Sequence, residues 1–467
     1  MFSAKCRISV QSHTRAFSSV VQSLRSPALY EPAFKLCTNT LRPPFSAHFS
    51  SVKIQLPEYK WIDGAENLEK YTKGGYHPVQ IGDILHHRYE VVDKLGFGGW
   101  STVWLSHDLL EKEYVAVKIG IADSLPHEVT TLRALATPTA VQACEPIPLV
   151  LDEFRIQGPN GSHPCCTTPV ALCNLRECSF SRLFRLDVAR TLAYELTLAV
   201  ALVHSRGYVH GDIHLRNVLV RAPQSLNKLS IQQFRDEYGQ PDLYPVERTD
   251  GHALPPCVPS TAVVPLYMGK TADEFTLADA HLLLSDFGVS FSPASQVRLG
   301  QDCHTPVDFR PPEARFEPNS PLSFSVDVWS LSTAIWDILG MRALFSSAFY
   351  SERQVMCQIV DTLGPMPASW LANWEDRTDF FDDQGVPAAG RYVWPKLAQA
   401  FEERVQKFRR DDDMGVFSPE ETEAILEMMA QMLKFRPEER PTVEQVLESR
   451  WMVSWALPDY RRGQVKS

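Results

Sequence analysis

The chain has 467 residues, of which 44% are apolar and 22% are charged, an ordinary composition for a globular protein with two or three packed units. The net charge of −10 is uneven, because residues 1–53 carry +6 and the remainder therefore carries −16. An acidic body argues against direct binding of nucleic acid. We find no window of about 18 uncharged apolar residues, so no transmembrane segment is expected.

Residues 1–52 form a basic, Ser-rich leader that contains no Asp. Its spaced arginines, without an uninterrupted apolar block, are typical of a mitochondrial transit peptide. A disordered basic tail has the same composition, so both interpretations stay open. We leave this segment out of the fold.

A β-rich region begins near residue 86. Residues 88–108 alternate apolar and polar side chains on either side of a Gly-rich turn, and residues 113–121 form a third strand-like run. Another hairpin is predicted over residues 149–172, where the glycines at 158 and 161 suit a tight turn. Between these runs, residues 127–136 predict a short helix.

After residue 174 the pattern becomes helical. Residues 188–207 repeat apolar side chains every three or four positions and end in Gly, where a helix stop is expected. Two further apolar helices are predicted at residues 327–340 and 420–434. Strands followed by helices predict an α+β, bilobal fold.

The two Pro- and Gly-rich stretches of the second half fit neither a helical nor a strand period, and we interpret them as insertions or long surface loops. The predicted organisation is a leader at 1–52, a β-rich N-terminal lobe at 53–173, a mainly helical C-terminal lobe at 174–455 with insertions near 221–281 and 364–418, and a tail at 456–467.

The Gly-rich turn, GFGGWS at residues 96–101, gains meaning from its neighbours. Its glycines lie between two predicted strands, where backbone N–H groups can approach a triphosphate closely because no side chain intervenes. Lys118 follows one strand later in the motif VAVK and is placed to reach phosphates under the turn. Glu128, on the predicted short helix, is the nearest acid that can hold Lys118.

Residues 210–217, HGDIHLRN, combine two histidines with an aspartate and an asparagine. Asp212 can accept the proton of an attacking hydroxyl, and Asn217 can hold a metal ion. A metal site built on His210 and His214 is disfavoured, because no third His or Cys lies at a suitable spacing. We therefore interpret His210 as a packed loop residue.

A carboxylate that binds Mg²⁺ through the phosphates is expected next along the chain. Asp286 follows an apolar strand in LLLSDFG, and Phe287 can pack into the core. Farther on, Glu313 and Arg440 are predicted to form a buried ion pair in the helical lobe. These motifs in this order favour a protein-kinase-like phosphotransferase that uses ATP.

Residues 71–108 carry a more specific resemblance. The motif KGGYHPV, and the run STVWL after the Gly-rich turn with Ser101 in the third Gly position, resemble the entry to the serine/arginine-protein kinases. The resemblance extends over about residues 57–455, and the segment at 221–281 stands where this family has a long spacer. It implies a serine/threonine protein kinase of cytoplasm and nucleus that uses ATP and Mg²⁺ and phosphorylates Arg/Ser-rich proteins.

The resemblance also implies residue roles. Lys118 would contact phosphates and pair with Glu128, Asp212 would be the catalytic base, and Asn217 and Asp286 would hold Mg²⁺. The residues expected to bind the nucleotide are Leu95, Gly96, Phe97, Gly98, Gly99, Trp100, Ser101, Val103, Ala116 and Lys118, with Thr168 as gatekeeper and Pro169 and Ala171 facing adenine.

Several positions depart from the family pattern. His214 stands where protein kinases usually have Lys, and we expect it to be the cation that faces the transferring phosphoryl group. Gly211 replaces the usual Arg, so switching by phosphorylation at Thr305 is not expected. The short separation of Lys118 from Glu128 predicts a helix that is trimmed at its start.

The loop HGD.H..N also resembles aminoglycoside and choline kinase-like small-molecule phosphotransferases, which is the alternative function. A pseudokinase scaffold is a third hypothesis. Acidic residues of the second insertion are expected to dock an Arg-rich substrate or else to form a solvated face; they are Glu375, Asp376, Asp379, Asp382, Asp383 and Asp411 to Asp413.

Overall fold

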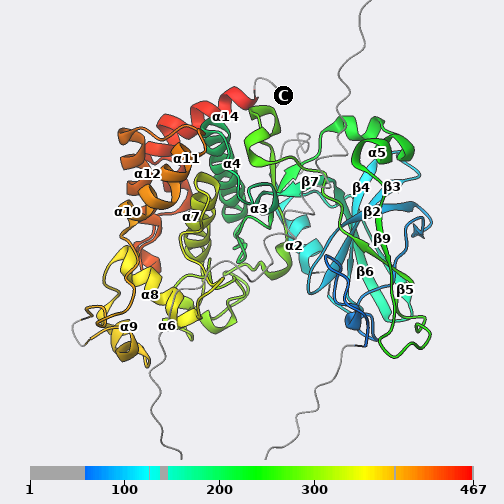
Figure 1. Cartoon of the computed structure of the whole chain (residues 1–467), viewed down its shortest axis with the longest axis horizontal. Coiled ribbons are helices and arrows are strands. Elements are labelled where there is room, and N and C mark those ends of the chain that lie inside the picture. Colours follow the sequence, from blue (N-terminus) through cyan, green and yellow to red (C-terminus); the bar gives the residue numbers. More distant parts are fainter. Residues whose placement is uncertain (1–57, 126, 137–145, 383–384, 465–467) are drawn as a thin grey trace, which may run out of the picture. The chain divides into compact units, whose positions relative to one another are not determined.

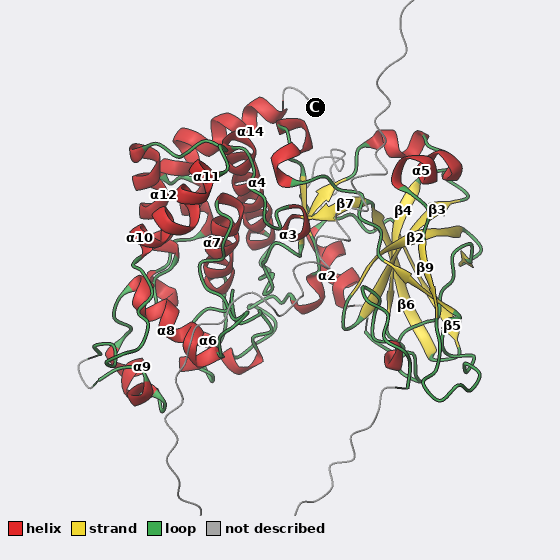
Figure 2. Cartoon of the chain, viewed as in Figure 1, coloured by secondary structure: helices red, strands yellow, loops and turns green. Residues whose placement is uncertain are grey.

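Two lobes, one built on strands and one on helices, make up residues 58–125, 127–136, 146–382 and 385–464, which the computed structural model describes (Figure 2). We call them the sheet lobe and the helical lobe. The predicted α+β bilobal fold is confirmed. The leader at residues 1–52 and Asp383 lie outside the described residues.

The sheet lobe is built on a six-stranded antiparallel sheet in the order β1-β2-β3-β4-β6-β5. Alternating side chains such as Val91, Trp104 and Val117 are buried on one face, as a period of two requires. The strands are β1 (Ile84–Leu85), β2 (Tyr89–Phe97), β3 (Ser101–Asp108), β4 (Tyr114–Gly120), β5 (Asp152–Gly158) and β6 (Gly161–Pro169).

Two smaller antiparallel sheets complete the strands of the described residues. One has the order β11-β8-β7, and the other is a hairpin of β9 and β10. Their bounds are β7 (Ala171–Asn174), β8 (Val218–Arg221), β9 (Asp242–Pro245), β10 (Thr261–Val264) and β11 (Leu282–Leu284).

Two long helices form the centre of the helical lobe. Helix α4 (Leu186–Ser205) buries the apolar stripe that the sequence predicts, and it packs against α7 (Ser325–Leu339). Nearly every side chain of α7 is buried, including Trp329 and Trp336, because other elements surround this helix on all sides. Full burial of such a side chain contributes about 1.5–3 kcal/mol.

Shorter helices cover this centre. The helix predicted at 420–434 is observed two residues shorter at its end, because α12 stops at Met432. The shorter helices are α2 (His127–Leu135), α3 (Leu175–Cys178), α6 (Glu313–Phe316), α8 (Glu352–Leu363), α9 (Ala368–Ala372), α10 (Leu397–Phe401), α11 (Lys407–Asp411), α12 (Pro419–Met432), α13 (Val443–Leu447) and α14 (Leu457–Gln464).

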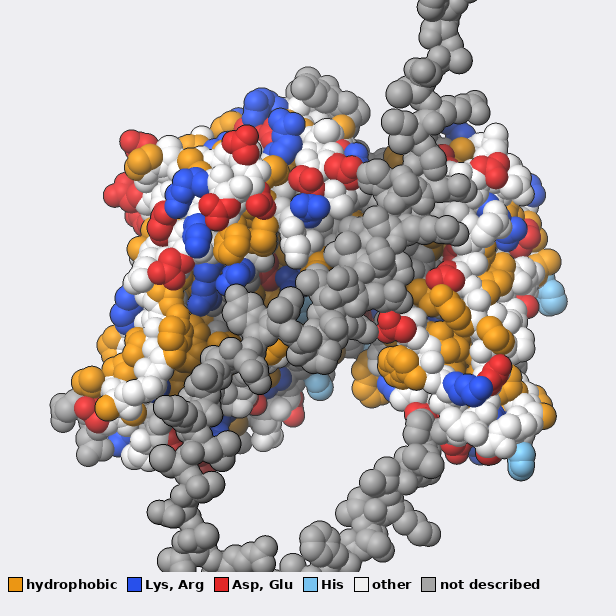
Figure 3. Space-filling view, in the orientation of Figure 1, with side chains coloured by type: hydrophobic (Ala, Val, Ile, Leu, Met, Phe, Trp, Pro, Cys, Tyr) orange, Lys and Arg blue, Asp and Glu red, His pale blue; other side chains and the backbone are white. Residues whose placement is uncertain are grey.

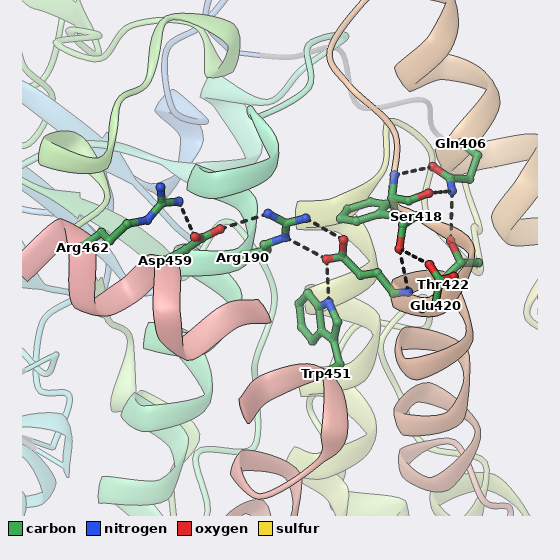
Figure 4. A network of polar contacts seen from close by, with 10 residues as sticks. Arg190, Gln406, Ser418, Glu420, Thr422, Trp451, Asp459 and Arg462 are labelled. Atoms are coloured by element: carbon green, nitrogen blue, oxygen red, sulfur yellow. Dashed lines mark hydrogen bonds and ion pairs between the residues drawn. The ribbon is translucent and has the colours of Figure 1, made fainter. Parts of the chain in front are cut away.

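A polar network ties α4, α12 and α14 together. Figure 4 shows Arg190 of α4 reaching Asp459 of α14. Arg190 lies 3.1 Å from Asp459, and it also pairs with Glu421 of α12 at 2.6 and 2.7 Å. Trp451 also donates to Glu421, at 3.1 Å. Glu421 is almost fully buried, so its charge depends on these donors.

The segment between β8 and β11 does not stay on the helical lobe. Its helix α5 (Ile231–Tyr238) begins at a capping box on Ser230 and buries Phe234 against Val92 and Tyr114 of the sheet lobe. Figure 1 shows α5 and β9 over the strands of the sheet lobe. The segment at 221–281, predicted as an insertion or a long surface loop, packs partly on the sheet lobe through α5 and partly in the core of the helical lobe through Ala272 and Phe275.

The second insertion, predicted at 364–418, carries α9, α10 and α11 with a π-helical turn at Glu402–Gln406. Helices of five residues are too short to show a clear helical period, which is why the sequence pattern did not reveal them. Among the described residues, no helix combines the length and apolar character that crossing a bilayer requires.

Candidate functional site

A pocket of about 290 Å³ opens beneath the turn between β2 and β3. Apolar side chains from both lobes line it, with Val103 and Ala116 from the sheet lobe and Leu219 from β8. Eleven predicted nucleotide-binding residues line it: Leu95, Gly96, Phe97, Gly98, Ser101, Val103, Ala116, Lys118, Thr168, Pro169 and Ala171.

The Gly-rich turn is closed by one of its own hydrogen bonds, from the N–H of Gly98 to the carbonyl of Ser101 at 2.9 Å. No described atom lies within 4 Å of a Cβ built on Gly96 or Gly98. The space that these side chains would fill is therefore open to a ligand. Trp100 and Gly99, at the tip of the turn, do not line the pocket, and Trp100 is 77% exposed.

Lys118 joins the two sides of the pocket. Its Nζ lies 2.6 Å from Glu128 and 3.3 Å from Asp286. Helix α2 starts at His127, next to Glu128, so the helix is as short at its start as the spacing predicts. His127 lies 2.7 Å from the carbonyl of Ser290, which anchors that end of the helix beside Asp286.

The three charges stabilise one another. Burial opposes the charge of Lys118, but the carboxylates of Glu128 and Asp286 outweigh it and raise the pKa of Lys118. Burial would raise the pKa of Asp286, but the charge of Lys118 holds that pKa below its usual value. Both shifts favour the charged forms of Lys118 and Asp286.

The loop at 210–217 is held from below by α7. Asp327 accepts the N–H groups of His210 and Gly211 at 2.7 and 2.8 Å, and it lies 2.9 Å from His204. Gly211 has φ of +79°, a conformation that an Arg would adopt only with strain. His210 is fully buried against Phe287, as predicted for a packed loop residue.

Asp212 lies at the mouth of this loop. The Nδ2 of Asn217 donates to its Oδ2 at 3.1 Å and to its carbonyl at 2.9 Å. The Oδ1 of Asp212 is buried and makes no hydrogen bond within the described residues, although the Nε2 of His214 approaches it to 3.4 Å. An unpaired carboxylate oxygen keeps the capacity to accept a hydrogen bond.

His214 packs beside Asp212 and is largely buried. Its ring lies 5.5 Å from the ring of Phe309, and its side chain is 11% exposed. Its Nε2 also lies 3.5 Å from the amide of Asn217. His214 is therefore close to both predicted catalytic groups of the loop.

The pairing of β8 with β11 brings the two predicted metal ligands to one edge. Leu284 at the end of β11 pairs with Val218 at the start of β8. Asn217, just before β8, and Asp286, just after β11, therefore lie at the same edge of this sheet. The N–H of Ser285 donates to the carbonyl of Asn217 at 2.8 Å, which fixes this register. The side chain of Asp286 is half-exposed toward the pocket.

The end of β6 forms the back of the pocket. Thr168 pairs with Ala116 of β4, and Pro169 and Ala171 continue the wall toward β7. Sequence patterns missed several lining residues, among them Leu266 and Tyr267 of the first insertion, for which no local signal exists. Leu219 could have been found, since it lies two residues after Asn217 on the same strand face.

The structure also shows the positions of the predicted ion pair and of Thr305. Arg440 pairs with Glu313 through two bonds of 2.6 and 2.7 Å, and both side chains are buried as expected. Thr305 is 1% exposed and donates to the carbonyl of Gly211 at 2.7 Å. A kinase acting on Thr305 would first have to displace it from this contact.

Comparisons with known proteins relate this chain to protein kinases. A model of the protein kinase domain matches residues 273–452. A serine/threonine protein kinase of Aspergillus fumigatus is 25% identical over 438 residues, which cover 90% of this chain and 97% of that protein. SRSF protein kinase 3 of Homo sapiens is 40% identical over 112 residues, which cover 22% of this chain and 20% of that protein.

The fold has a counterpart among solved structures. The crystal structure of a kinase domain superposes with a TM-score of 0.56 at 16% identity, covering 81% of this chain and 98% of that chain. This likeness concerns the fold alone.

Proposed function

This chain is a serine/threonine protein kinase similar to the SR-protein kinases, and we propose that Lys118, Asp212 and Asp286 carry its phosphotransfer. The observation that supports the proposal is the position of Lys118 Nζ in the pocket, 2.6 Å from Glu128 and 3.3 Å from Asp286. Such a lysine, held by an acid on one side, can bind the phosphates of ATP on the other. Thr168, Pro169 and Ala171 would then border the adenine.

A protein kinase uses ATP together with a divalent cation, and we propose that Asn217 and Asp286 hold Mg²⁺ here. A carboxylate and an amide oxygen suit this hard cation. The residues fit the ion, because Asp286 is half-exposed at the pocket and Asn217 adjoins it across two paired strands. When bound, the cation supplies positive charge beside the phosphate oxygens.

Asp212 would accept the proton of the attacking hydroxyl. Its Oδ1 lacks a hydrogen bond among the described residues, whereas its Oδ2 is fixed by Asn217 at 3.1 Å. One oxygen therefore orients the carboxylate while the other is left for the substrate. The pairing also explains why Asn217 stands five residues after Asp212.

His214 would face the transferring phosphoryl group in place of a lysine. Its Nε2 lies 3.4 Å from Asp212, so a phosphoryl acceptor held by Asp212 would be within its reach. A protonated imidazole there offers both a hydrogen bond and a charge, whereas a neutral one offers only the hydrogen bond. This assignment makes turnover sensitive to the charge of the ring.

For the substrate we propose Arg/Ser-rich proteins. This proposal is based on the resemblance of the motif KGGYHPV and on the name of the human relative. The acidic residues of the second insertion differ in how available they are to bind a basic substrate. Asp376 lies 2.7 Å from Arg353, which also approaches Asp379 to 3.7 Å, so these acids are already paired. Figure 3 shows acidic and basic side chains interspersed over the visible face of the helical lobe.

The acids at the end of α11 are better candidates for docking. Asp411, Asp412 and Asp413 are all exposed and adjacent in sequence. Three neighbouring carboxylates at a surface attract an Arg-rich segment, and such attraction weakens as salt screens it. We therefore place the docking of basic substrates at α11 rather than at residues 375–382.

The test is phosphotransfer from labelled ATP by the purified full chain. The acceptors are an Arg/Ser-repeat peptide, the matched Lys/Ser peptide, a generic basic protein and a set of amino-alcohols. We expect the Arg/Ser peptide to be preferred about tenfold over the Lys/Ser peptide, because a guanidinium pairs with carboxylates through two bonds. Transfer to amino-alcohols alone would overturn the protein-kinase assignment, and equal use of both peptides would overturn the Arg preference.

The same assay examines the residue roles. Lys118→Met and Asp286→Ala should each abolish transfer while the melting temperature stays near that of the wild type, since both residues act at the pocket. Wild-type turnover in either variant would eliminate the assignment.

Location is a separate question, because the leader at residues 1–52 and the family resemblance point to different compartments. A fluorescent protein fused behind residues 1–52 distinguishes them. Mitochondrial fluorescence would support a transit peptide, and diffuse fluorescence in cytoplasm and nucleus would support a basic tail.

A further inference from the structure

The segment that precedes the first strand touches the tip of the Gly-rich turn. We call this segment, residues 58–79, the strap. The hydroxyl of Tyr76 donates to the carbonyl of Gly98 at 2.5 Å, and Lys70 Nζ donates to the carbonyl of Gly99 at 3.3 Å. Two successive carbonyls of the turn are therefore held by side chains from outside the sheet.

The strap can hold the turn only because its own backbone is fixed. The N–H of Gly74 donates to the carbonyl of Asn160 at 2.9 Å, and the amide of Asn160 returns a 2.6 Å bond to the carbonyl of Tyr76. Ala122, just after β4, donates to the carbonyl of Gly75 at 2.9 Å. These bonds attach the strap to the turn between β5 and β6 and to the residues that follow β4.

The two glycines of KGGYHPV are needed for this path. Gly74 has φ of +87°, which favours glycine. A Cβ on Gly75 would lie 1.8 Å from the carbonyl oxygen of Lys70, which excludes any side chain. The turn thus brings Lys70 and Tyr76 to the same end of the strap, where the N–H of Tyr76 donates to the carbonyl of Lys70 at 3.0 Å.

A buried charge pair places the strap on β2. Lys94 of β2 pairs with Glu66, and Tyr71 donates to the same carboxylate, all three being almost fully buried. Burial lowers the pKa of Lys94, and the charge of Glu66 opposes that fall. The ring of Tyr71 then packs edge-on against Tyr76 at 5.5 Å.

The first insertion covers the strap from outside. Tyr76 is 3% exposed and belongs to a cluster with Val246, Val258 and Ala262 of the insertion. Asn160 also donates to the carbonyl of Cys257 at 3.0 Å. Tyr76 is therefore enclosed between the strap and the insertion, with its hydroxyl directed at Gly98.

We propose that Tyr76 and Lys70 are positioning residues for the phosphates of ATP. In a planar trans peptide the N–H points opposite to the C=O, so holding the carbonyls of Gly98 and Gly99 toward the strap turns the next N–H groups away from it. Neither Tyr76 nor Lys70 lines the pocket, as far as the described residues show. This inference rests on the proposed function, because it assigns to the phosphates of ATP the N–H groups of Gly99 and Trp100, which lie at the tip of the turn just outside the pocket lining.

The test compares binding of ATP with binding of adenosine, which fills the same pocket without phosphates. Tyr76→Phe removes one hydroxyl, and a neutral hydrogen bond of this kind corresponds to about fivefold in affinity. We expect ATP binding, measured by calorimetry with a divalent salt, to weaken about fivefold while adenosine binding stays constant. In turnover assays the KM for ATP should rise more than kcat falls.

Tyr71→Phe is the matched control. It also removes a buried hydroxyl from the strap, and the ring centres of Tyr71 and Tyr76 are 5.5 Å apart, but that hydroxyl binds Glu66 and not the turn. It should lower the melting temperature without changing the ratio of ATP to adenosine affinity. If Tyr76→Phe does not fold, Lys70→Met replaces it, because Lys70 is exposed and its weaker bond predicts about a twofold change in the ratio.

The positioning role is overturned if the Tyr76 or Lys70 variant keeps the wild-type affinity ratio, or if ATP and adenosine weaken equally. Failure of the proposed function has a different signature: the wild-type protein itself would bind ATP no better than adenosine, which overturns both proposals. A changed ratio in Tyr76→Phe with an unchanged ratio in Tyr71→Phe supports the inference.

Discussion

Replacing Glu128 by Gln keeps the size of the side chain and removes its charge, which makes it the sharpest probe of the pocket. Lys118 would then have Asp286, now 3.3 Å away, as its remaining carboxylate among the described residues. A closer contact between Lys118 and Asp286 competes with the divalent cation that Asp286 is proposed to hold. The variant should therefore lose activity and also require more divalent cation.

The size of the loss follows from the contact. The 2.6 Å bond between Lys118 and Glu128 joins two partly buried charges, with 26% and 19% of the side chains exposed. A charge-assisted bond of this kind contributes about 1.5–3 kcal/mol. At about 1.4 kcal/mol for each factor of ten, kcat/KM for ATP should fall about 10- to 150-fold.

The assay is steady-state phosphotransfer over a series of Mg²⁺ concentrations. We expect high Mg²⁺ to recover part of the lost activity in Glu128→Gln. Glu153→Gln is the control, because Glu153 forms a 2.5 Å ion pair with Arg133 of the same helix, away from the pocket. Wild-type kcat/KM in Glu128→Gln, or an equal loss in Glu153→Gln, would refute the reasoning.

Four further predictions follow from other contacts. Glu421→Leu should lower the free energy of unfolding by about 1.5–3 kcal/mol, because Arg190 loses its two bonds to Glu421 and keeps the one to Asp459, whereas Glu423→Leu, whose partner Arg450 is exposed, should cost less than about 1 kcal/mol in the same urea titrations. Burial and the neighbouring His163 lower the pKa of His77 to about 4, so the unfolded chain takes up a proton before the folded one does. The free energy of unfolding should fall by up to about 3 kcal/mol as pH drops from about 6.5 toward 4. In His77→Phe the melting temperature should depend less on pH over that range, and an unchanged pH dependence contradicts this. The ratio of kcat in His214→Lys to that of the wild type should rise between about pH 6.5 and 8.5, since Lys stays charged where imidazoles are generally neutral; a flat ratio would mean that His214 only packs the loop. Changing Asp411, Asp412 and Asp413 together to Asn should raise KM for an Arg-rich peptide two- to fivefold at low salt and little at high salt, and an unaltered KM would leave these acids as a solvated face.

Local patterns identified the chemical groups of the site. Lys118, Asp212 and Asp286 each lie in a motif of a few residues whose meaning comes from a strand or turn beside it. In the structure Lys118 and Asp286 line one pocket together with Glu128 and Asn217, and Asp212 adjoins it through its hydrogen bond with Asn217. Their catalytic roles remain proposals.

The sequence by itself therefore determined the fold class, the order of the lobes and the candidate chemistry, because glycine spacing, strand alternation and helical stripes are properties of neighbouring residues. Only the tertiary structure decided which distant segments meet. Tyr76 reaches Gly98, Phe234 of an insertion packs on the sheet lobe, and Arg353 pairs with Asp376 before any substrate arrives. Such contacts depend on how whole elements pack, and residues that meet across tens of positions leave no period in the sequence.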